Sequence, residues 1–234
     1  MLVGMEEPLN KRVFWSISLL ALALCLSLPA MAQTTFFNDL GPTGNVYQCC
    51  TGWTISGTGS IGFSFTAANE FTSLASGSVS QIDLGVGYVS GFLNQFYAAV
   101  YTVGADGLPG TEIWSQSDLT SNQQFGGCCG LVTLTGISGL TLSAGQSYFV
   151  VLGPEDINNN AYLAWNLNST GATGIDLFSR DGGQTWTSNG EQTIGAFDIL
   201  GGSTGTTVPE PSSLLLLGSG LVGAFSTLRR RMVR

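Results

Sequence analysis

Histidine is absent from the 234 residues. Its absence excludes Ser-His-Asp and Cys-His catalysis, zinc sites with histidine ligands and a histidine pH switch. Basic residues are scarce between residues 33 and 208, where Arg180 stands alone against twelve acidic side chains, a formal charge of −11. Such an acidic body repels phosphate backbones, so we expect no nucleic-acid partner.

Sustained helical periodicity is also missing from residues 33–202. Short segments rich in β-branched and aromatic residues recur instead, bounded by Gly, Asn and Asp, which is typical of strands. Nine or more such segments in about 170 residues predict an all-β domain, a jelly-roll-like β-sandwich. The expected strands span 60–66, 79–86, 95–103, 112–117, 131–134, 147–152, 161–166, 175–179 and 193–200.

The core of this sandwich is expected to hold large apolar side chains from those strands. A domain of this size buries roughly 70% of its unfolded surface, which suffices for an independent core. The candidates are Phe63, Phe65, Leu84, Phe96, Val100, Trp114, Phe149, Val151, Trp165 and Phe197.

The N-terminus has the three parts of a secretory signal peptide. Lys11 and Arg12 precede an apolar run over 13–28, and small residues at Ala30 and Ala32 follow. A basic region, an apolar region and an A-x-A site in this order predict cleavage by signal peptidase after Ala32. Residues 1–32 are therefore interpreted as a signal peptide, 33–202 as the extracellular domain and 203–208 as a linker.

The C-terminus ends in a charge-free stretch, 212–228, followed by Arg229, Arg230 and Arg231. Seventeen helical residues span about 26 Å, slightly less than a ~30 Å hydrocarbon core, and snorkelling arginines can cover the difference. The arginine cluster is expected to stop transfer on the cytoplasmic side, leaving the acidic body outside. A plain transmembrane anchor is the alternative interpretation.

Pro209, Glu210 and Pro211 directly precede this stretch. Together with the apolar helix, the arginine cluster and the signal peptide, they resemble the sorting segment of PEP-CTERM proteins, here 209–234. The resemblance implies that an exosortase recognises Pro209-Glu210-Pro211. It also implies export through an inner-membrane-anchored intermediate to the cell envelope or exopolysaccharide matrix.

The body resembles the choice-of-anchor sandwich domains that are often joined to such tails. The matching features are the Gly-Leu-Pro-Gly turn at 107–110, the segment 142–152 and the Trp165 strand. The resemblance implies a β-sandwich and carries no established chemistry.

Four cysteines follow the signal peptide, in two adjacent pairs: Cys49-Cys50 and Cys128-Cys129. An even number outside the cytoplasm favours disulfides over a thiolate metal site, which usually needs CxxC-like spacing. Two pairings cross-link the doublets and one consists of two vicinal bridges. Cross-linking is preferred because a bond between adjacent residues closes a strained ring.

Residues 179–186 match the Asp-box pattern S-x-D-x-G-x-T-W, with Ser179, Asp181, Gly183, Thr185 and Trp186. They resemble a hairpin of sialidases and many other secreted β-proteins. Its carboxylate is expected to bond backbone N–H groups while Gly supplies positive φ. The hairpin is a folding device; sialidase chemistry would need several arginines and repeated boxes, so it is rejected.

Oxygen-rich side chains cluster at Glu155, Asp156 and Asn158–Asn160. The spacing does not complete an EF-hand. A looser calcium site at Glu155 and Asp156 is one interpretation, and a solvated turn, for which Asn and Asp are ordinary residues, is the other.

Three functions remain. The first is a non-enzymatic surface or matrix protein without a cofactor. The second is a carbohydrate-binding module, with or without calcium, in which Trp53 or Trp186 stacks on sugars; core or hairpin packing is the favoured interpretation of both tryptophans. The third is a hydrolase using two of Glu70, Glu112, Glu155 and Glu191; nothing in the sequence brings two together, so it is least favoured.

Overall fold

The computed structural model describes residues 33–202. The signal segment with Ala30 and Ala32, the linker, the Pro209-Glu210-Pro211 motif and the arginine cluster lie outside the described residues. Between residues 33 and 202, no helix is long and apolar enough to cross a membrane.

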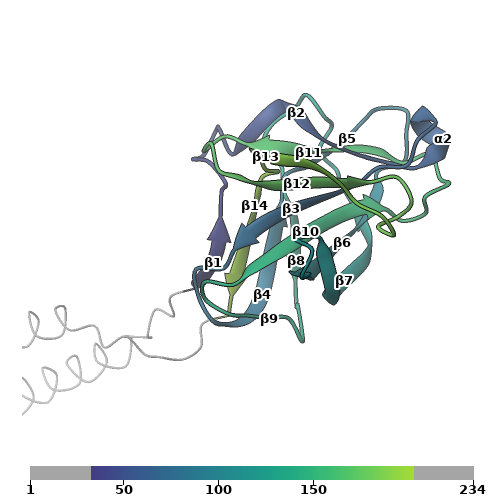
Figure 1. Ribbon diagram of the computed structural model, residues 1–234. Coiled ribbons are helices and arrows are strands. Elements are labelled where there is room, and N and C mark those ends of the chain that lie inside the picture. Colours follow the sequence, from purple (N-terminus) through teal and green to yellow (C-terminus); the bar gives the residue numbers. More distant parts are fainter. Residues whose placement is uncertain (1–32, 203–234) are drawn as a thin grey trace, which may run out of the picture. The chain divides into compact units, whose positions relative to one another are not determined.

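The described chain is nearly all β, with one helix of four residues (Figure 1). Its elements are β1 (Thr34–Asn38), β2 (Tyr47–Ser56), α2 (Thr58–Ile61), β3 (Thr66–Thr72), β4 (Gly77–Leu84), β5 (Val86–Tyr88), β6 (Gln95–Val103), β7 (Pro109–Thr120), β8 (Val132–Thr135), β9 (Thr141–Leu142), β10 (Ser147–Pro154), β11 (Tyr162–Asn168), β12 (Thr173–Ser179), β13 (Thr187–Thr193) and β14 (Phe197–Gly201).

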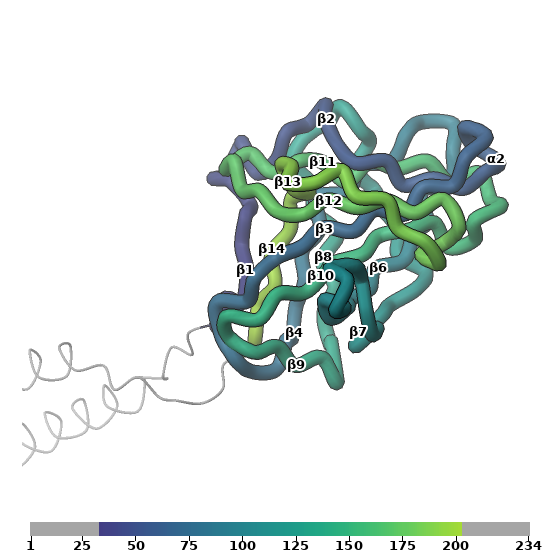
Figure 2. Tube along the Cα trace, viewed as in Figure 1, coloured from purple at the N-terminus to yellow at the C-terminus, as the bar shows by residue number. Residues whose placement is uncertain are grey.

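The strands form three sheets, and the paired strands within them run antiparallel. The largest has the order β13-β12-β3-β10-β6-β7; a second has β1-β14-β4-β8, with β9 also on β4; the third has β2-β11-β5. Non-consecutive neighbours are common, so the trace crosses repeatedly between sheets (Figure 2). The expected all-β class is confirmed and is consistent with a β-sandwich, whereas jelly-roll connectivity stays a prediction.

Strand β10 shows why the large sheet is so apolar. Val150 and Leu152 point into the main core, and the alternate residues Phe149 and Val151 point to the opposite face. There they join Leu177 and two alanines in a second buried cluster. A strand that is covered on both faces has a continuous apolar sequence, whereas a strand with one solvent-exposed face alternates between apolar and polar residues.

The expected strands are correct where they are strongly apolar. The range 95–103 coincides with β6, and most of the others overlap β4, β5, β7, β8, β10, β11, β12 and β14. The strand expected at 60–66 is wrong: α2 occupies its first residues, Gly62 ends the helix with φ +83°, and β3 begins at Thr66. Strands β1, β2, β9 and β13 were not expected, and neither was β3 beyond its first residue, Thr66; Thr193 is the one residue of β13 within an expected range.

Three core candidates need correction. Phe63 is 54% exposed, because it lies in the irregular segment between α2 and β3. Phe65 and Trp114 are half-buried, and Trp114 packs against the edge of the main core. The other seven candidates are buried, and Trp165 is the largest fully buried side chain.

Gly195 explains how Trp165 fits. The indole Nε1 donates to the carbonyl of Ala196 at 3.1 Å, so the ring lies against the backbone just before β14. A Cβ on Gly195 would overlap the Trp165 ring atoms, so only glycine leaves room for the indole at this position.

Three aspartates in or directly beside the β1-β14-β4-β8 sheet are buried. Asp83 on β4 and Asp198 on β14 are cross-strand partners, 7% and 6% exposed, and Asp39 follows β1 at 2%. Each has one buried carboxylate oxygen without a hydrogen-bond partner among the described residues. Burial and the neighbouring Asp83 raise the pKa of Asp198 to about 7. Burial, with a smaller effect of Asp198, raises the pKa of Asp39 to about 8.

Candidate functional site

A cavity of about 210 Å³ lies where β2 meets the β3–β12–β13 end of the large sheet. It combines aromatic side chains with a carboxylate and an amide, both of which belong to the large sheet. We call it the aromatic cavity; its lining is Trp53, Thr54, Phe65, Ala67, Asp176, Leu177, Phe178 and Asn189.

The polar part of the aromatic cavity is built around Asp176. Its carboxylate accepts from Asn69 Nδ2 at 2.7 Å and from Asn189 Nδ2 at 2.5 Å. Asn69 is itself fixed, because its Oδ1 accepts from the Gly195 N–H at 2.7 Å. Burial raises the pKa of Asp176 to about 6, although the hydrogen bonds from Asn189 and Asn69 lower it. The carboxylate is therefore fixed in orientation, with one hydrogen bond to each oxygen, and Asp176 is only 1% exposed.

The apolar part is an aromatic wall. Trp53 is half-buried, and its Nε1 donates to the Thr193 carbonyl at 3.1 Å, which fixes the orientation of the indole. Phe65 and Phe178 contact each other with ring centroids 5.9 Å apart. Rings held in this way offer flat apolar faces without losing further side-chain freedom on binding.

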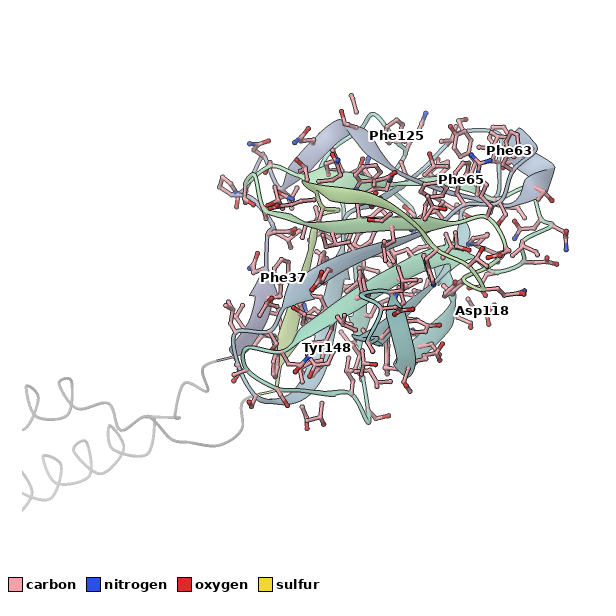
Figure 3. The ribbon with its side chains drawn as sticks, in the orientation of Figure 1. Phe37, Phe63, Phe65, Asp118, Phe125 and Tyr148 are labelled. Carbon is pink, nitrogen blue, oxygen red and sulfur yellow. A yellow bond between two sulfur atoms is a disulfide. The ribbon has the colours of Figure 1, made fainter. Side chains whose placement is uncertain are left out.

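Arg180 extends the wall outward. Its guanidinium lies 5.1 Å from the ring centroids of both Phe63 and Phe65, and 5.8 Å from that of Phe178. Phe63 and Phe65 lie together at the end of the fold that carries α2 (Figure 3). The cation of the acidic body thus stacks on one exposed and two half-buried aromatic rings, an arrangement that is stabilised electrostatically.

The Asp box has the hydrogen bonds of a tight hairpin between β12 and β13. Asp181 Oδ1 accepts from the Thr185 N–H at 2.9 Å and from Ser179 Oγ at 2.7 Å, and Oδ2 accepts from Thr185 Oγ1 at 2.6 Å. These bonds lower the pKa of Asp181 to about 2. Gly182 and Gly183 supply φ of +73° and +91°. Trp186 packs on the second buried cluster, so it serves the hairpin.

Glu155 and Asp156 point to separate partners. Glu155 Oε1 accepts from the Asp118 N–H at 2.5 Å, at a residue of β7 whose φ is +58°. Asp156 Oδ1 accepts from the Asn158 N–H at 2.8 Å within its own turn. Burial is the largest cause that raises the pKa of Glu155. Both carboxylates thus have structural partners in the part of the chain described.

Glu70 and Glu191 line one groove of about 430 Å³, with Phe37, Leu74 and Ile175 among its other residues. Glu191 Oε1 accepts from Thr173 Oγ1 at 2.7 Å. The sequence offered no reason to pair these two, because only the β3–β12–β13 order brings them to the same face.

The cysteines differ from the expected pairing. The disulfide joins Cys128 to Cys129, while Cys49 and Cys50 are free thiols. The doublets nevertheless meet, because the Sγ atoms of Cys49, Cys128 and Cys129 all lie within 4.8 Å of one another. The doublets meet because backbone hydrogen bonding docks the β7–β8 loop on β2.

The sequence predicts the residues of the aromatic cavity only in part. It indicates Trp53 as a sugar-stacking residue, but it does not indicate Asp176, Asn189 or Phe178 as members of a site. Asp176 alternates with apolar neighbours on β12, and an acidic residue within a strand of this kind is a usable signal for a site.

Comparison with protein-family models finds the PEP-CTERM protein-sorting motif at residues 207–231. The match includes Pro209-Glu210-Pro211 and the three arginines 229–231. It implies that the protein is exported, sorted at the membrane and processed by an exosortase. A comparison with curated proteins finds no significant match to the chain.

Proposed function

We propose that the protein is a non-enzymatic component of the bacterial cell surface or exopolysaccharide matrix, delivered there by its C-terminal tail. The sorting motif at 207–231 supports the delivery part of this proposal, because its role is in protein sorting. The acidic, nearly all-β body between the two terminal segments supports it, since such a domain suits a soluble extracellular environment.

The proposal is tested by fractionating cells with and without their exosortase gene. In the wild type, we expect the protein in the envelope or matrix fraction without its tail. Without the exosortase, the full-length chain should accumulate in the membrane fraction. If the protein is distributed equally between the fractions of both strains, the tail acts only as a membrane anchor.

Carbohydrate binding is the second candidate function, and the aromatic cavity favours it. Sugar rings present apolar C–H faces that stack on aromatic side chains, and hydroxyl groups that bond carboxylates and amides. The fixed indole of Trp53 provides the first. Asn189, an exposed residue whose amide is oriented by the buried Asp176, provides the second. Phe63 would add a stacking position outside the cavity.

A glycan array with the exported protein, with and without calcium, identifies a ligand. Phe63→Ala should then weaken binding of that glycan about fivefold to tenfold, the loss of about 1 kcal/mol expected for one stacked ring. Leu74→Ala is the matched control, because Leu74 is also an exposed apolar side chain, 72% against 54% for Phe63, and lies in another groove. No bound glycan, or equal losses in both variants, would contradict carbohydrate binding at this cavity. Loss of glycan binding when calcium is removed would indicate a calcium site at Glu155 and Asp156.

A further inference from the structure

We propose that the thiol of Cys49 exchanges with the Cys128–Cys129 disulfide, so that a single disulfide bond occupies two alternative positions in the folded protein. In the second position, the bond joins β2 to the loop between β7 and β8. No cofactor or partner is required.

The argument begins with the proximity of three sulfur atoms. The Sγ atoms of Cys49, Cys128 and Cys129 lie within 4.8 Å of one another, although Cys49 is about 80 residues away in sequence. The Cys49 thiol is half-buried and free, and Cys128 is exposed. A free thiol is thus held beside a disulfide, which is the arrangement that thiol–disulfide exchange requires.

Hydrogen bonds outside the cysteine side chains hold the two segments together. The Gly126 N–H donates to the Cys49 carbonyl at 2.9 Å. The hydroxyl of Tyr47, a buried residue at the start of β2, donates to the Gly130 carbonyl at 3.0 Å. The loop therefore stays docked on β2 whichever pair of sulfurs is bonded, so exchange needs no large rearrangement.

The step conserves atoms and electrons. Cys49 loses its proton to water, and the resulting thiolate attacks Sγ of Cys128 or Cys129. A bond forms between Cys49 and the attacked sulfur as the Cys128–Cys129 bond breaks. The electron pair leaves on the other sulfur, which takes up a proton. One disulfide is present before and after, so neither an oxidant nor a reductant takes part.

Exchange would change what holds the loop. In the structure, the disulfide lies within the loop and does not bond it to β2; after exchange, a covalent bond joins the two. The same loop contributes Gln123 and Gly130 to a cavity of about 460 Å³ beside β8. The second position of the disulfide would therefore fix one wall of that cavity.

The test is peptide mapping of the exported protein under non-reducing conditions. Samples held at pH 6 and at pH 8.5 are quenched in acid, which stops exchange, and are digested with pepsin. Thiol–disulfide exchange is faster at higher pH, so at pH 8.5 the peptide containing Cys49 should become joined to the peptide containing Cys128 and Cys129. The number of free thiols per chain should stay constant, as exchange demands.

Two variants separate this proposal from other cysteine chemistry. Cys50→Ser should show the same joined peptides, because Cys50 is exposed and outside the sulfur cluster. Cys49→Ser should show none and retain the Cys128–Cys129 bond. Joined peptides in Cys49→Ser, a falling thiol count as they form, or a wild type that keeps its only bond at Cys128–Cys129 at pH 8.5 would each overturn the proposal.

Discussion

The buried pair Asp83–Asp198 predicts that this protein is less stable at neutral pH than at mildly acidic pH. Both carboxylates are over 90% buried on neighbouring strands, and Asp198 has a pKa of about 7 in the folded state against 3.8 ordinarily. Because the pKa of Asp198 is raised on folding, the folded protein binds more protons than the unfolded chain between pH 3.8 and about pH 7. The associated stability is complete below pH 3.8 and is lost as the pH rises to about 7.

The perturbation that isolates this effect is Asp198→Asn. It removes one charge of the pair and offers an amide donor to the Asp83 carboxylate, whose Oδ1 has no partner among the described residues. Unscreened, the pKa difference represents about 4 kcal/mol. Water screens the pair in part, so we expect a gain of about 1–2 kcal/mol at pH 8, or roughly 2–8 °C in Tm. At pH 5, where Asp198 is already protonated in the folded protein, the gain should be close to zero.

The assay is thermal unfolding of the wild type and the variant at pH 5 and pH 8. Asp106→Asn is the matched control, because Asp106 is exposed and its Oδ1 bond to the Leu108 N–H is one that asparagine keeps. A wild type equally stable at both pH values, or an Asp198→Asn variant destabilised by the same amount at both, would refute the reasoning. Asp39, whose pKa is raised from 3.8 to about 8, should add to the loss over that whole range, up to about pH 8.

Two further predictions concern packing and the Asp-box hairpin. Gly195→Ala should lower the free energy of unfolding by about 1–3 kcal/mol in urea titrations, because its Cβ would overlap the ring of Trp165; an unchanged midpoint would show that the indole can shift. Asp181→Ala should speed amide exchange at Thr185 on the order of tenfold, because the Thr185 N–H donates to Asp181 Oδ1. Unchanged exchange there would mean that the remaining hairpin contacts suffice.

The sequence predicts the strands of this fold best where apolar character is strong. Strand β6 has the predicted bounds, and β10 is recognisable although its two faces are buried in different clusters. Strand β13, Thr187–Thr193, has no apolar pattern, because it is the edge of the large sheet and is held by main-chain pairing with β12. Pairing of this kind depends on the partner strand and leaves little trace in the local sequence.

The candidate site shows a similar division. The Asp box is recognisable because the hydrogen bonds among Ser179, Asp181 and Thr185 join residues at most four apart in sequence, so local sequence determines their geometry. The aromatic cavity joins Trp53 to Asp176 and Asn189, more than 120 residues away, and only the strand order brings them together. The cysteine pairs likewise meet through the docking of the β7–β8 loop, which no spacing rule predicts.

Intact mass and terminal sequencing of the protein recovered from cells test the central claim most directly. Export followed by sorting predicts a mature chain that begins at Gln33 and lacks the apolar stretch and the arginines of the tail. A mature protein that still ends at Arg234 would contradict processing of the tail, and one that keeps residues 1–32 would contradict removal of a signal peptide.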